Sequence, residues 1–127
     1  MIQQIEPEYV EAFGIHEALR KFGFRSDDIF FSIGISANFG GRCMHIILKT
    51  QGKQFIMTVC KIDDDVTDEQ VYNRWSEVAT LMSSHMISQD EANRMWQQSQ
   101  MGKNQDDFEA LALAIQAKGF FLPGLMS

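Results

Sequence analysis

The clearest pattern along the chain is an alternation of apolar and polar positions from residue 29 to residue 60. In the segment 29–36 the odd positions are Ile or Phe, and the even positions are Phe30, Ser32, Gly34 and Ser36. Such a period of two predicts a β-strand. The segment Cys43–Cys60 predicts a hairpin with a two-residue turn, at Gln51-Gly52 or at Gly52-Lys53. Because Asn38–Gly41 contains residues that tolerate positive φ, we expect the first strand to pair with this hairpin in an antiparallel meander.

Helical periodicity surrounds the predicted sheet. A first helix is expected from about Pro7, and Gly23 is suited to cap its end. Two capping-box patterns, Thr67–Gln70 and Ser88–Glu91, predict the starts of two more helices, and a last helix is expected over 105–118. The order predicts an α+β fold: an N-terminal helix, a three-stranded antiparallel meander, then about three helices packed on the sheet. The length of 127 residues favours a single domain, 1–127.

Chemically capable side chains gather on one face of the predicted sheet. A two-residue turn keeps the parity of the hairpin whichever turn is used. It therefore predicts that both cysteines share a face with the only histidine of the hairpin and with the serines of the first strand. This candidate site consists of Ser32, Ser36, Cys43, His45, Thr58 and Cys60.

Three kinds of chemistry compete at this face with simple packing. Cys43, His45 and Cys60 are zinc-ligand types, but a closed structural site needs a fourth ligand and no Cys-x-x-Cys element occurs. A thiol–imidazole pair is the second alternative, although neither cysteine starts a helix that would lower its pKa. A redox-switchable disulfide requires Cys43 to lie opposite Cys60. The alternative to these three chemistries is that the face is simply packed and that each cysteine acts as a small apolar residue. We favour this alternative. No catalytic residue, metal ligand or cofactor is therefore assigned.

Two further segments attract attention. Clustered oxygens in the acidic run Asp63–Glu69 suit calcium or magnesium, but the spacing does not match an EF-hand loop. We favour a turn followed by a helix start, where the dipole stabilises negative charge. The C-terminal residues 120–127 are apolar, and they pack on their own domain or form an interface with a partner. The candidate interface residues are Phe120, Phe121, Leu122, Leu125 and Met126.

Composition narrows the function classes. The net charge of −6 and the scattered basic residues argue against nucleic-acid binding. No apolar run is long enough for a membrane span, and the N-terminus lacks the pattern of a signal peptide. Two cysteines do not make a disulfide framework, so we expect a cytoplasmic location with free thiols.

The sequence therefore favours a small, soluble, acidic, non-catalytic module for protein interaction or small-ligand binding. We expect it to self-associate, for example as a homodimer, or to bind a protein partner. A meander with open edge strands would support pairing with another chain. The alternative is a metal-binding protein or thiol enzyme that uses the face of Cys43, His45 and Cys60.

Overall fold

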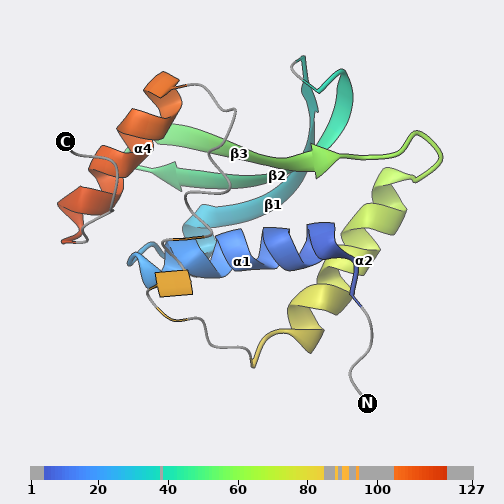
Figure 1. Cartoon of the computed structure of the whole chain (residues 1–127), viewed down its shortest axis with the longest axis horizontal. Coiled ribbons are helices and arrows are strands. Elements are labelled where there is room, and N and C mark those ends of the chain that lie inside the picture. Colours follow the sequence, from blue (N-terminus) through green and yellow to red (C-terminus); the bar gives the residue numbers. More distant parts are fainter. Residues whose placement is uncertain are drawn as a thin grey trace.

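The computed structural model describes residues 5–37, 39–84, 88, 90, 91, 94 and 105–119. Within these ranges the predicted α+β class is confirmed: an N-terminal helix precedes a three-stranded antiparallel sheet, and further helices follow (Figure 1). In chain order the elements are α1 (Pro7–Lys21), η1 (Ser26–Asp28), β1 (Ile29–Ser36), β2 (Gly41–Thr50), β3 (Lys53–Lys61), α2 (Asp68–Leu81) and α4 (Gln105–Ala117). The helix predicted after Ser88 falls mostly outside the described residues.

The sheet has the order β1-β2-β3 with β2 in the centre. Its hairpin turn is Gln51-Gly52, with φ of 52° and 74°, and Thr50 pairs with Lys53. Two positive φ values identify a type I′ turn, whose twist matches that of the flanking strands. The structure therefore selects the first of the two predicted turns.

The core lies on one face of the sheet, which we call the inner face. Its strand residues alternate as predicted, and the buried residues of the helices join the same cluster. From the sheet it includes Ile29, Met44, Ile46, Leu48, Phe55 and Met57, and from the helices Phe13, Leu19, Val71, Val78, Leu111 and Ile115. Burial of this apolar area is the main stabilising term of the fold.

Aromatic contacts fasten α2 to the first strand. The Trp75 ring stacks on Phe31 with centroids 4.4 Å apart and an interplanar angle of 5°. Tyr72 meets the same Phe31 ring edge-on at 5.8 Å, and its hydroxyl accepts a hydrogen bond of 3.1 Å from the backbone N–H of Ile33. This hydroxyl occupies one backbone group on the outer edge of β1, so α2 protects part of an edge that was predicted to be open.

The segment between β3 and α2 forms the predicted helix start. The Thr67 side chain accepts from the N–H of Gln70, and the Gln70 side chain accepts from the N–H of Thr67. This reciprocal capping box satisfies two backbone donors at the start of α2. Among the described residues, no helix has the length and apolar character needed to cross a membrane.

Candidate functional site

Five of the six candidate site residues share the outer face of the sheet, on the side opposite to the inner face. The register pairs Ser32 with His45 and His45 with Thr58, so the imidazole stands between two hydroxyl-bearing residues on the neighbouring strands. On the same face Cys43 pairs with Gly34, and Ser36 pairs with Gly41 at the end of β1. The predicted gathering of small and polar side chains around His45 therefore exists for these five residues.

Cys60 does not belong to this face. The pairing of β2 with β3 shifts between Met44 and His45: Met44 pairs with Cys60, whereas His45 pairs with Thr58. Val59 is thus an extra residue, a β-bulge, and it reverses the parity of everything after it. The prediction that a two-residue turn keeps both cysteines on one face is wrong, and so is the register that would place Cys43 opposite Cys60.

Cys60 instead faces a cleft of about 580 Å³ between the start of α1, the end of β3 and the first turns of α2. The pKa of its thiol is raised to about 11, first by burial and then by the negative charges of Glu8 and Glu11. A thiol with such a pKa is almost entirely protonated at neutral pH and is a weak nucleophile. The surroundings of Cys60 therefore oppose a catalytic thiolate.

An ion pair forms one wall of this cleft. The Arg74 guanidinium on α2 donates hydrogen bonds of 3.0 and 2.9 Å to the two carboxylate oxygens of Glu6. These bonds lower the pKa of Glu6. Burial together with the charges of Glu6 and Glu8 raises the pKa of the neighbouring Tyr9. The pair ties the start of α1 to α2.

Cys43 and His45 are enclosed by packing. Cys43 has no exposed surface, and its thiol donates to the carbonyl of Gly41 at 3.5 Å. The His45 side chain is 6% exposed, and its ring lies against the α-carbon of Gly34 on β1. With so little accessible surface, these two side chains serve tight packing of the sheet better than contact with a substrate.

The cysteines are free thiols. Across the described part of the chain, no group of three or more His, Cys, Asp or Glu side chains is placed to hold a metal ion. Ser32 and Thr58 are the cross-strand neighbours of His45, whereas Ser36 lies four residues beyond Ser32 along β1.

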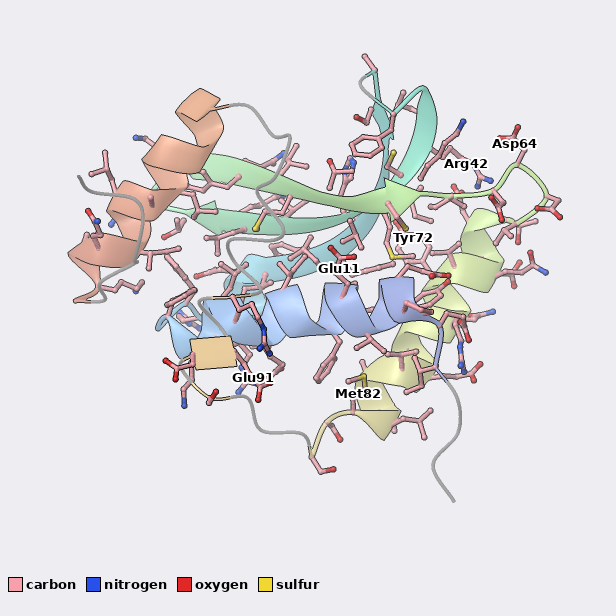
Figure 2. The ribbon with its side chains drawn as sticks, in the orientation of Figure 1. Glu11, Arg42, Asp64, Tyr72, Met82 and Glu91 are labelled. Carbon is pink, nitrogen blue, oxygen red and sulfur yellow. The ribbon has the colours of Figure 1, made fainter. Side chains whose placement is uncertain are left out.

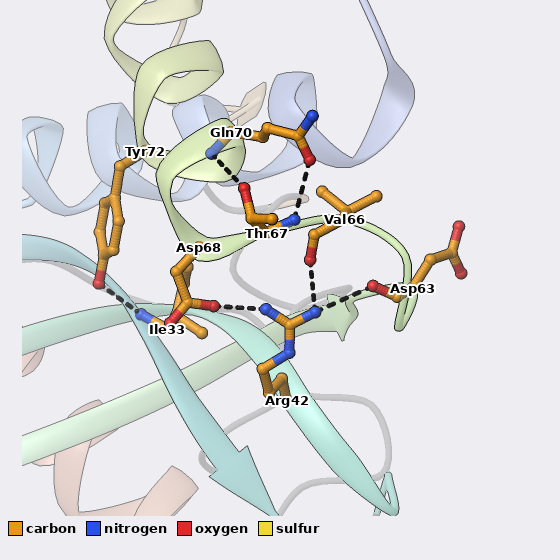
Figure 3. Close-up of polar contacts among 8 residues, drawn as sticks. All are labelled: Ile33, Arg42, Asp63, Val66, Thr67, Asp68, Gln70 and Tyr72. Carbon is orange, nitrogen blue, oxygen red and sulfur yellow. Dashed lines mark hydrogen bonds and ion pairs between the residues drawn. The ribbon is translucent and has the colours of Figure 1, made fainter.

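The acidic run before α2 has a structural explanation in Arg42. Figures 2 and 3 show this side chain reaching from β2 towards the loop. The guanidinium donates to the carbonyl oxygens of Asp63 and Val66 and forms an ion pair with Asp68. The Arg42 guanidinium thus holds the turn and the first residue of α2 together. This arrangement agrees with the interpretation of the acidic run as a turn followed by a helix start.

Sequence reasoning missed an apolar row on the outer face. Phe30 pairs with Ile47, and Ile47 pairs with Ile56, so the three side chains form one line across all three strands. We call Phe30, Ile47 and Ile56 the outer apolar row. Phe30 is 42% exposed and Ile56 46% exposed, while Ile47 is half-buried between them. The alternation within each strand places Phe30, Ile47 and Ile56 on the same face. Only the pairing register between the strands brings the three side chains into one line.

The candidate interface at the C-terminus (Phe120, Phe121, Leu122, Leu125 and Met126) lies outside the described residues. Comparison with known proteins found no matching family model, no matching curated protein and no matching solved structure. The functional argument therefore depends on the geometry alone.

Proposed function

We propose that this protein is a non-catalytic binding module that contacts a protein partner through the outer face of its sheet. The observation that carries the proposal is the outer apolar row. Large apolar side chains that share a contiguous exposed line are typical of interaction surfaces, whereas isolated exposed ones are not. Phe30 and Ile56 are both more than 40% exposed and both contact Ile47 through direct cross-strand pairing.

The chemistry of the cysteines supports a binding function over a thiol enzyme or a Cys/His metal site. The bulge at Val59 separates Cys60 from Cys43 and His45, and burial together with nearby carboxylates keeps the Cys60 thiol protonated. The rigid three-stranded sheet, fastened to α2 by Trp75 and Tyr72, supplies a preorganised surface. Preorganisation lowers the entropic cost of binding.

Site-specific photo-crosslinking in expressing cells tests this proposal. A photoreactive phenylalanine analogue replaces Ile56 in one variant and Leu113 in the control. Leu113 on α4 is 61% exposed, and it borders a hollow at the hairpin turn and Phe55 that contains no residue of the row. We expect a discrete adduct of higher mass from position 56 and not from position 113. Equal labelling at both positions, or no adduct at position 56, would contradict the proposal.

Self-association is a separate part of the proposal, through the C-terminal candidate interface. It is tested by the solution mass of the chain with and without residues 120–127. A dimer that becomes a folded monomer on truncation supports it. A wild-type monomer that unfolds on truncation would assign these residues to the core.

A further inference from the structure

The charged residues of the three strands are all basic, whereas the chain as a whole is acidic. The three strands contain four basic residues and no aspartate or glutamate, in a chain whose net charge is −6. Two of these basic residues, Lys49 and Lys61, belong to the outer face, since Lys49 pairs with Gln54 and Lys61 pairs with Cys43. Towards the turn end, the carboxylate of Asp28 lines a shallow hollow together with Lys49.

Of these two lysines, Lys49 lies beside the outer apolar row. Lys49 lies two residues beyond Ile47 along β2, and its ammonium group sits 5.2 Å from the centre of the Phe30 ring. Lys61 is remote from the row, because it pairs with Cys43 and its side chain ends next to Gly41, six residues from Ile47 along β2. The surface is therefore an apolar line with a positive charge beside it at Lys49.

The dimensions of the row match those of a helix face. Neighbouring strands are about 4.8 Å apart, so the row extends roughly 10 Å across three strands. Positions i, i+3 or i+4, and i+7 of an α-helix share one face and span about the same length, at 1.5 Å per residue. A helix that crosses the strands could thus place three apolar side chains along Phe30, Ile47 and Ile56, with its flanking residues close to Lys49.

We infer that the occupant of the outer face is an acidic amphipathic helix of another protein, which packs its apolar stripe on Phe30, Ile47 and Ile56 and its carboxylates beside Lys49. This inference rests on the proposed function and specifies the partner. A second copy bound symmetrically through the same face is opposed by charge, because it would bring lysines together on strands that carry no carboxylate. A nucleic acid is disfavoured by the net charge of −6 and by a row in which two of three side chains are aliphatic.

The test uses the full chain and two synthetic helical peptides. Each has about 18 residues, long enough for an isolated helix to be populated, with leucines at i, i+3 and i+7. One carries glutamate and the other lysine at the positions that flank the leucines. Fluorescence anisotropy gives the affinity, and amide chemical shifts locate the contact. We expect the glutamate peptide to bind about tenfold more tightly and to shift the amides of Phe30, Ile47 and Ile56.

Matched variants separate charge from apolar contact. In Lys49→Glu we expect the preference to reverse in favour of the lysine peptide. The control Lys21→Glu changes the net charge equally at an exposed position at the end of α1 and should keep the original preference. Phe30→Ser/Ile56→Ser should lose binding of both peptides, whereas Leu113→Ser should not. Backbone amide spectra verify that each variant is folded.

Several results would overturn the inference. Equal affinity for both peptides would contradict an acidic partner. Loss of the preference in both charge variants alike would contradict it as well. Tighter binding of oligothymidylate at the same amides would identify a nucleic-acid surface instead. Absence of binding by either peptide would exclude a helical partner of this design. The proposed function is decided independently, since photo-crosslinking at position 56 requires neither a helical nor an acidic partner.

Discussion

The imidazole of His45 lies against the α-carbon of Gly34 on the neighbouring strand. A β-carbon at position 34 would stand 2.9 Å from Cε1 and 3.0 Å from Nδ1 of His45, which is closer than such atoms approach. The backbone of Gly34 does not require positive φ, so glycine is needed here for space alone. The burial of His45 on the outer face therefore depends on the missing side chain of Gly34, its diagonal neighbour on β1.

Gly34→Ala should destabilise the fold by about 1–3 kcal/mol, the usual cost of overpacking, measured by urea unfolding. Gly41→Ala is the matched control, because its added carbon would meet only the flexible end of Lys61 at 3.4 Å. We expect a much smaller loss there. In Gly34→Ala/His45→Ala the two changes should couple favourably, since the second makes room for the first. Equal losses at positions 34 and 41 would refute the steric explanation.

The Cys60 thiol should titrate near pH 11, measured by the rate of alkylation against pH in a Cys43→Ala background. Glu8→Gln should move the midpoint downwards, because it removes one of the charges that raise the pKa. Since the folded pKa lies above the unfolded value, the contribution of this thiol to stability is complete below pH 9. It is then lost as the pH rises from about 9 to about 11. A midpoint equal to that of the urea-unfolded chain would contradict the described surroundings.

Arg42→Ala should cost about 2 kcal/mol, because it leaves two backbone carbonyls and an ion pair without their donor. Asp68→Asn removes only the charge of a carboxylate whose side chain is 58% exposed, and should cost under about 1 kcal/mol. Urea unfolding gives both values. Hydrogen exchange in the turn at residues 63–67 should accelerate in Arg42→Ala first. Similar losses in the two variants would mean that the ion pair, rather than the backbone contacts, dominates.

Tyr72→Phe should accelerate hydrogen exchange at the Ile33 amide and cost about 1 kcal/mol. The change removes the hydroxyl that accepts from Ile33 and leaves the ring in place against Phe31. The amides of β2, which are bonded within the sheet, serve as internal controls. Unchanged exchange at Ile33 would show that the hydroxyl does not protect this edge.

Local signals determined much of this fold. The period of two in residues 29–36 and 43–60 predicted the strands, and a two-residue loop at Gln51-Gly52 or Gly52-Lys53 predicted the hairpin. Thr67 with Gln70 predicted the start of α2. Each of these depends on contacts between residues close in sequence. Such contacts need no knowledge of the rest of the chain.

Tertiary structure alone decided the features that depend on register and on distant partners. No residue type in the sequence marks the bulge at Val59, because the extra residue shows only in the pairing of β3 with β2. The bulge nevertheless moves Cys60 from the outer face to the cleft. Likewise, parity places Phe30, Ile47 and Ile56 on one face, but their alignment requires the pairing of all three strands. The sequence by itself thus determined which segments become strands and helices. The pairing between strands determined which side chains meet, because one residue of slip exchanges the two faces of a sheet.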